Sequence, residues 1–155
     1  MKKNDELILE INDITREGSG VGKYNDMVIF VPLTAVGDIV KVKILKVKKS
    51  FCYGKAEEIL TPSKDRILPD CEVFKKCGGC VYRHLDYSAE CNLKENQVFE
   101  VMKRIGKTDV KPNKIISAEN TTHYRNKAQY PVSADGEAGF YAFHSHRIIP
   151  CDDCL

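Results

Sequence analysis

The first sixty residues carry the hydrophobic pattern of short β-strands. The pattern is clearest where apolar residues alternate with lysines along Val40, Lys41, Val42, Lys43 and Ile44. A period of two residues predicts a strand with one buried face and one exposed face. Leu45 and Val47 continue out of phase, so we expect a β-bulge near Ile44–Leu45.

Other short apolar runs predict further strands around this one. Runs at 7–14, at 27–31 before Pro32, and at 51–59 are separated by glycine-containing turns. Several short strands with such turns are typical of a small, partly open barrel of the oligonucleotide-binding kind. We therefore expect residues 1–61 to form an OB-like β-barrel, followed by a proline-bounded linker at 61–69.

A single helix is predicted after residue 88. Ser88 is a plausible N-cap, and Gly106 would end the helix. An apolar stripe with helical spacing predicts core packing for Ala89, Leu93, Val98, Val101, Met102 and Ile105. Cys91 lies within this helix and is interpreted as a structural thiol.

Alternation predicts β-structure again near the end of the chain. We expect a strand at 124–130 with Arg125, Lys127 and Gln129 on one face, then a turn at Asp135–Gly136. A second strand would run from Gly139 through Phe143 to Cys151. The fold class is thus mainly β with one helix (α+β). We expect three segments: the barrel at 1–61, a cysteine-bearing loop region at 62–92, and the helix with an incomplete β domain at 93–155.

Composition narrows the class of protein. The chain has 155 residues, of which 43% are hydrophobic and 30% charged, as in ordinary globular proteins. It contains no apolar run long enough to cross a bilayer and no signal-peptide core, so we expect a cytoplasmic protein. Seven cysteines in a reducing compartment indicate a metal or cluster site in preference to disulfides.

Positive charge is clustered although the net charge is only +2. Within nine residues lie five lysines and no acidic residue: Lys41, Lys43, Lys46, Lys48 and Lys49. They either guard a strand edge or bind the phosphates of RNA, with Phe30, Phe51 or Tyr53 as base-stacking rings. The barrel pattern favours RNA.

The cysteines Cys71, Cys77 and Cys80 have C-x5-C-x2-C spacing, with Gly78 and Gly79 between the last two. Zinc would need a fourth ligand such as His84 or Cys91. An iron–sulfur cluster takes four thiolates, often three close in sequence and one remote. Spacing alone favours neither metal over the other. For His84 we prefer a packed, hydrogen-bonded histidine to a ligand.

The stretch D-C-E-V-F-K-K-C-G-G-C-V-Y-R-H-L-D-Y resembles the iron–sulfur signature of the RNA (uracil-5-)-methyltransferases, bacterial enzymes that make 5-methyluridine in 23S rRNA. The segment I-T-R-E-G-S-G-V-G-K-Y-N-D-M-V-I-F-V-P resembles their RNA-binding TRAM barrel. The segment H-Y-R-N-K-A-Q-Y-P-V resembles the opening strand of their central domain, and H-R-I-I-P-C-D-D-C-L resembles the segment that carries their fourth cluster ligand.

This resemblance implies a [4Fe–4S] cluster held by Cys71, Cys77, Cys80 and Cys154, with Cys151 as the alternative fourth ligand. A structural role for the cluster is favoured over redox sensing, because methyl transfer through a cysteine adduct needs no electron.

The resemblance also implies S-adenosylmethionine as cofactor and places the cofactor domain, the nucleophilic cysteine and the carboxylate base after residue 155. We therefore expect the front part of a longer, monomeric enzyme, with no catalytic residue in this chain and no activity by itself. The expected contribution is recognition of RNA, most simply 23S rRNA, by Lys41, Lys43, Lys46, Phe30, Arg125 and Lys127. The alternatives are a freestanding RNA-binding module with a zinc- or cluster-stabilised accessory domain, a zinc-ribbon protein, and a tRNA uracil-5-methyltransferase.

Overall fold

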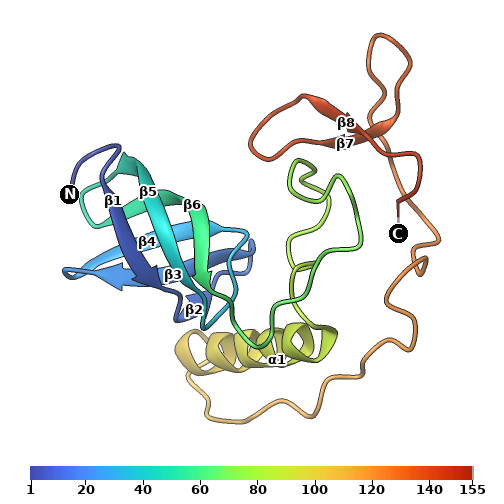
Figure 1. Ribbon diagram of the computed structural model, residues 1–155. Coiled ribbons are helices and arrows are strands. Elements are labelled where there is room, and N and C mark those ends of the chain that lie inside the picture. Colours follow the sequence, from blue (N-terminus) through green and yellow to red (C-terminus); the bar gives the residue numbers. More distant parts are fainter. Residues whose placement is uncertain (155) are drawn as a thin grey trace.

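The N-terminal part of the chain forms a curled six-stranded sheet (Figure 1). The computed structural model describes residues 1–154. The strands are β1 (Glu6–Glu10), β2 (Asp13–Ile14), β3 (Ser19–Tyr24), β4 (Met27–Pro32), β5 (Ile39–Val47) and β6 (Phe51–Thr61). Their order in the sheet is β1-β5-β6-β4-β3-β2, with β4 and β6 parallel and the other pairs antiparallel.

The strands β1 and β2 are consecutive in the chain but lie at opposite edges of the sheet, so the sheet must curl to bring these edges together. β1 pairs with β5, whereas β2, which follows almost directly, pairs with β3. The Asn12 amide donates to the carbonyl of Val21 at 2.8 Å, which brings the two edges together. Gly22 makes this approach possible, since a Cβ there would lie 2.5 Å from the carbonyl oxygen of Glu10. The predicted OB-like barrel is confirmed in this form.

The predicted bulge is also confirmed. The register between β5 and β6 shifts between Ile44 and Lys46, where the apolar alternation goes out of phase. Before the shift, the inward residues of β5 enter the first core cluster, which contains Leu9, Ile11, Ile29, Val31, Val40, Val42, Ile44 and Cys52.

The helix α1 spans Tyr87–Arg104, and its cap differs from the predicted one. Asp86, not Ser88, is the N-cap: its carboxylate accepts a hydrogen bond from the Ser88 amide at 2.9 Å. A carboxylate suits this position because it also compensates the positive end of the helix dipole. Ser88 is the second residue of the helix, too late to cap it, and its hydroxyl instead donates to Asp86.

The predicted apolar stripe of α1 packs only in its first half. Leu93 contacts a second core cluster and Cys91 is buried. Val98, Val101 and Ile105 are 51%, 55% and 78% exposed, so core packing is the wrong interpretation for this end of the helix. Helical spacing of apolar residues shows which face they share, but not whether a neighbouring element covers that face.

The second core cluster joins the barrel to the segment that follows it. It contains Ile14 and Ala35 from the barrel and Tyr82 and Leu85 from the region before α1. The Tyr82 hydroxyl donates within 2.8 Å to the carbonyl of Arg16, a loop residue of the barrel. The cysteine-bearing region is therefore anchored on the barrel, with α1 below it in Figure 1.

The C-terminal part contains a small hairpin of β7 (Gly139–Tyr141) and β8 (Ile148–Pro150). Two predictions are wrong here. Residues 124–130 form no strand, and the strand from Gly139 turns back after Tyr141 to pair with β8. An extended segment becomes a strand only where a partner completes its hydrogen bonds, and within residues 1–154 none pairs with 124–130. Leu155, the end of the third predicted segment, lies outside the described residues. No helix within the described chain is long and apolar enough to span a membrane.

Candidate functional site

Five of the seven cysteines line one cavity of about 210 Å³. Cys71, Cys77 and Cys80 come from the loop before α1, and Cys151 and Cys154 from the segment after β8. Aromatic rings and Arg83 complete the wall. Tyr130 and Phe140, with ring centroids 5.0 Å apart, cover one side of it. The fold thus brings together two cysteine segments that are about seventy residues apart in the sequence.

Backbone contacts hold the first cysteine segment against the β7–β8 hairpin, which leads directly into the second. The Gly78 amide donates to the carbonyl of Tyr141 at 2.8 Å, and Cys77 forms a β-bridge with Ala142. Gly79 lies against the Phe140 ring, 3.1 Å from where its Cβ would stand. A side chain at position 79 would therefore push the cysteine loop away from the hairpin. This contact explains the glycine pair better than turn formation alone does.

One contact in the cavity suits a thiolate ligand, whereas burial of Cys80 favours its neutral thiol. The Gly79 amide donates to the Cys77 sulfur at 3.3 Å, a contact of the kind that tunes cluster thiolates. Desolvation raises the pKa of the Cys80 thiol, while the nearby Arg83 guanidinium acts in the opposite direction. Arg83 is itself held by two hydrogen bonds to Asp70, at 2.6 and 2.8 Å.

The structure brings the cysteine thiols together around the cavity but does not arrange them as a complete coordination shell. Among residues 1–154, no three His, Cys, Asp or Glu side chains stand close enough together to hold a metal ion. A cluster places several irons between its thiolates and spaces them more widely than a single ion would. Five thiols around one partly apolar space fit such a group chemically.

His84 lies outside the cysteine cavity. Its side chain is 1% exposed, and Nε2 lies 3.0 Å from the carbonyl oxygen of Thr34 in the barrel. Because a carbonyl only accepts, Nε2 must carry the hydrogen and Nδ1 is left as a buried acceptor without a partner. The prediction of a packed, hydrogen-bonded histidine is confirmed. Cys91, the other candidate for a fourth zinc ligand, is buried in α1 and does not line the cavity.

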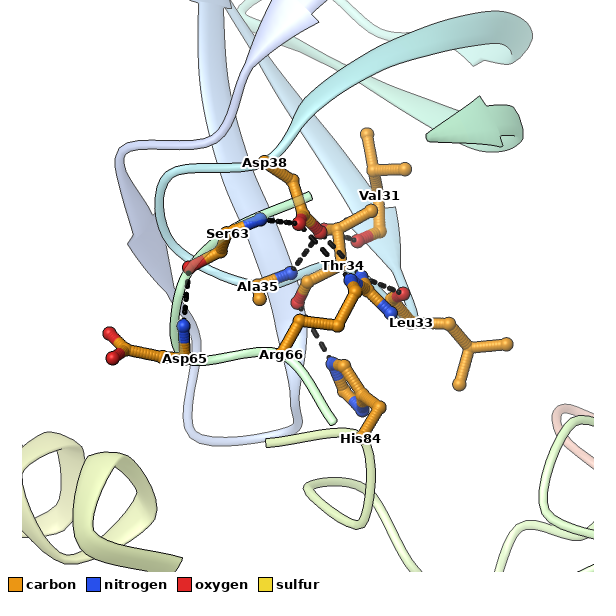
Figure 2. Close-up of polar contacts among 9 residues, drawn as sticks. All are labelled: Val31, Leu33, Thr34, Ala35, Asp38, Ser63, Asp65, Arg66 and His84. Atoms are coloured by element: carbon orange, nitrogen blue, oxygen red, sulfur yellow. Dashed lines mark hydrogen bonds and ion pairs between the residues drawn. The ribbon is translucent and has the colours of Figure 1, made fainter. Parts of the chain in front are cut away.

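A buried ion pair that sequence reasoning missed lies beside His84 (Figure 2). Asp38 is fully buried and accepts from Arg66 through both carboxylate oxygens, and from the amides of Ala35 and Ser63. Burial raises the pKa of Asp38, but these hydrogen bonds outweigh burial and hold the pKa below its usual value. The Gly37-Asp38 pair is a turn signal in the sequence, and nothing there indicates a partner 28 residues away.

The histidine should make stability pH-dependent. Burial has the largest effect and lowers the pKa of His84. The hydrogen bond to Thr34 opposes it, the charge of Arg66 lowers the pKa further, and the charge of Asp38 raises it. His84 therefore binds a proton more readily in the unfolded chain than in the folded chain. We expect the free energy of unfolding to be unaffected by His84 above pH about 6.5 and to fall below it, by at most about 1.4 kcal/mol per pH unit.

Urea unfolding of wild type and His84→Gln between pH 5 and 7.5 measures this slope. Glutamine can still donate to Thr34 but does not titrate in this range. The other histidines, His123, His144 and His146, are exposed in both proteins. An equal slope in the two proteins would show that His84 is not responsible.

The residues predicted to bind RNA lie in two places. Lys41, Lys43, Lys46 and Phe30 are on the barrel; Arg125 lines the cysteine cavity, and Lys127 is exposed on irregular chain nearby. Lys41 is paired with Glu6 at 2.7 Å. The face that Arg125 and Lys127 were predicted to share does not exist, because no strand forms there.

Comparison with known proteins shows which domain the barrel resembles. Residues 2–56 match the family model described as the TRAM domain. This range covers the strands β1 to β5 and most of β6. The residues that form most of the barrel are therefore similar to a TRAM domain.

The rest of the chain has relatives too. A protein of Listeria monocytogenes named an uncharacterized RNA methyltransferase is 45% identical over all of this chain. Similarly named proteins of Clostridium acetobutylicum and Synechocystis are 42% and 37% identical, over 100% and 94% of this chain. The chain is similar to these proteins and spans 33–35% of their length.

A solved structure shares the fold. The tRNA (uracil-54, C5)-methyltransferase of Pyrococcus abyssi, in complex with S-adenosyl-L-homocysteine, superimposes with a TM-score of 0.62 at 24% identity. The match covers 94% of this chain and 32% of that protein. The barrel, helix and hairpin thus occur together in another protein.

Proposed function

We propose that this chain is the RNA-recognition part of an S-adenosylmethionine-dependent 23S rRNA (uracil-C5)-methyltransferase. The observation that carries the proposal is the TRAM barrel joined to a five-cysteine cavity, in a chain related along its length to proteins named RNA methyltransferases. The protein would act in the cytoplasm, where its thiols stay reduced, and as a monomer.

The cysteine cavity would hold a [4Fe–4S] cluster through Cys71, Cys77, Cys80 and Cys154. When bound, the cluster supplies covalent cross-links between the cysteine loop and the segment after β8. The cysteine loop contacts the hairpin through Gly78 and Cys77, and no backbone hydrogen bond within the described residues joins it to residues 151–154, so added bonds would fix the geometry of the two segments. Cys151 donates to the carbonyl of Asp153 at 3.4 Å, which suits a neighbouring thiol more than a ligand.

The chain's own residues would bind and orient RNA. A uracil must leave its stacked or paired context before chemistry at C5 can reach it. Lys43 and Lys46 on the barrel, and Arg125 and Lys127 beside the cavity, would hold phosphates on either side of such a distorted region. We expect no catalytic residue in this chain, because the nucleophile and the base would belong to the rest of the enzyme.

The isolated chain is expected to bind RNA without methylating it. Incubation with tritiated S-adenosylmethionine and unmodified 23S rRNA fragments should transfer no methyl group, whereas the same fragments should bind in a filter or anisotropy assay. Methyl transfer by the chain alone would overturn the proposal that this chain binds RNA while the rest of the enzyme carries the catalytic residues. Tighter binding to tRNA than to the rRNA fragments would transfer the proposal to a tRNA substrate.

A further inference from the structure

Three aromatic rings form a cluster on the outside of the barrel. Phe30 comes from β4, and Phe51 and Tyr53 come from β6, next to it in the sheet. The ring centroids are 5.6 Å apart for Phe30–Phe51, 6.0 Å for Phe30–Tyr53 and 5.4 Å for Phe51–Tyr53. Each ring therefore contacts the other two, and we call this group the aromatic triad.

The aromatic triad takes no part in the core of the barrel. On the same strands, Ile29, Val31 and Cys52 are fully buried and belong to the first core cluster. Side chains alternate between the two faces of a strand, so the rings of the triad point outward. Tyr53 is 44% exposed. Three neighbouring rings on a solvent face suggest a binding surface, because packing does not require them there.

Lysines border the aromatic triad on the β5 side. Lys46 is the cross-strand partner of Tyr53, and the Lys48 amide donates to the carbonyl of Phe51 at 2.8 Å. Both lysines are exposed, and neither forms an ion pair with any described residue. Lys43, three residues before Lys46 on β5, also forms no ion pair with any described residue. Lys41 differs, since Glu6 neutralises it.

We propose that the aromatic triad and the lysines beside it are a binding site for single-stranded RNA, in which unpaired bases stack on the rings while Lys46 and Lys48 hold the phosphates. This inference rests on the proposed function and locates the RNA contact on one face of the TRAM barrel. Charge complementarity identifies the occupant: free ammonium groups beside flat π-surfaces match a polyanion with exposed bases. Duplex RNA does not fit, because its bases are already stacked on one another.

The test is binding of fluorescein-labelled oligouridine, and of a duplex RNA of equal length, to the whole chain by fluorescence anisotropy. Tyr53→Ala should weaken binding of the single strand roughly 5- to 100-fold. Tyr53→Phe should bind nearly as tightly as wild type, because the ring remains. Lys46→Ala should weaken binding moderately and make it less dependent on salt.

Tyr24→Ala is the matched control. Tyr24 is 41% exposed, close to the value for Tyr53, but it lies at the end of β3 beside Met1 and Leu7. Its removal should leave the affinity within twofold of wild type. Because both tyrosines are exposed, neither substitution should unfold the barrel, and circular dichroism can check that directly.

The outcomes separate the two proposals. Wild type that binds RNA, with Tyr53→Ala binding equally well, would overturn the aromatic site and leave the proposed function standing. Equal loss of single-strand and duplex binding in Tyr53→Ala would also overturn it, since stacking would not be the cause. Wild type that binds no RNA at all would overturn both.

Discussion

Replacing Cys77 by serine is expected to reduce the iron content of the anaerobically purified protein from about four atoms per chain to nearly none. Cys77 is 8% exposed, lines the cysteine cavity and accepts the hydrogen bond from Gly79. Serine is a poor ligand for iron at this position because its hydroxyl is not ionised at neutral pH. Iron and sulfide analysis, together with the visible absorption of the cluster, measures the loss.

The same variant should lose order locally and not throughout. The first core cluster contains no cavity cysteine, and the second joins Tyr82 and Leu85 to the barrel without one. Hydrogen exchange should therefore speed up around residues 71–80 and in β7 and β8, and stay slow in the barrel.

Cys91→Ser is the matched control, since Cys91 is also 8% exposed but lies in α1, away from the cavity. It should keep its iron. Comparing Cys151→Ser with Cys154→Ser then identifies the fourth ligand, because only one of them should lose iron as Cys77→Ser does. Full iron content in Cys77→Ser would refute the site.

The barrel could be predicted because its pattern is local. Alternation of apolar and charged residues defines β5, and its phase change marks the bulge between Ile44 and Lys46. Both signals need only neighbouring residues, and the hydrophobic core then selects the register. The cysteine cavity was partly predictable for a different reason: thiols at close spacing imply a shared centre, wherever the backbone runs.

Features that depend on a distant partner could not be predicted. The strand expected at 124–130 has suitable alternation but no partner in the described chain. The exposed end of α1, with Val98 and Ile105, has the spacing of a packed helix but no covering element there. Asp38 and Arg66 are ordinary turn and linker residues in the sequence, and only the fold makes them a buried pair.

That buried pair leads to the second large effect. Asp38→Ala is expected to lower the free energy of unfolding by about 3 kcal/mol or more, because it leaves the Arg66 guanidinium in a mostly buried site without its countercharge. The amides of Ala35 and Ser63 also lose their acceptor, which adds to the cost. Because the pKa of Asp38 lies below its usual value, this stabilisation is present above pH about 4 and is lost as pH falls further.

Glu6→Ala removes a matched but exposed ion pair and is the control. Glu6 and Lys41 also link two elements, β1 and β5, but their side chains are 47% and 44% exposed, compared with 0% for Asp38 and 19% for Arg66. Solvent screens such a pair, so its loss should lower the free energy of unfolding far less than the loss of Asp38 does. Urea unfolding at pH 7 compares the free energies of unfolding of the two variants. The double variant Asp38→Ala/Arg66→Met should recover part of the lost stability, because no unpaired charge remains buried. Similar small costs for Asp38→Ala and Glu6→Ala would mean that the seam between the barrel and the cysteine region is held by the second core cluster alone, with the ion pair contributing little.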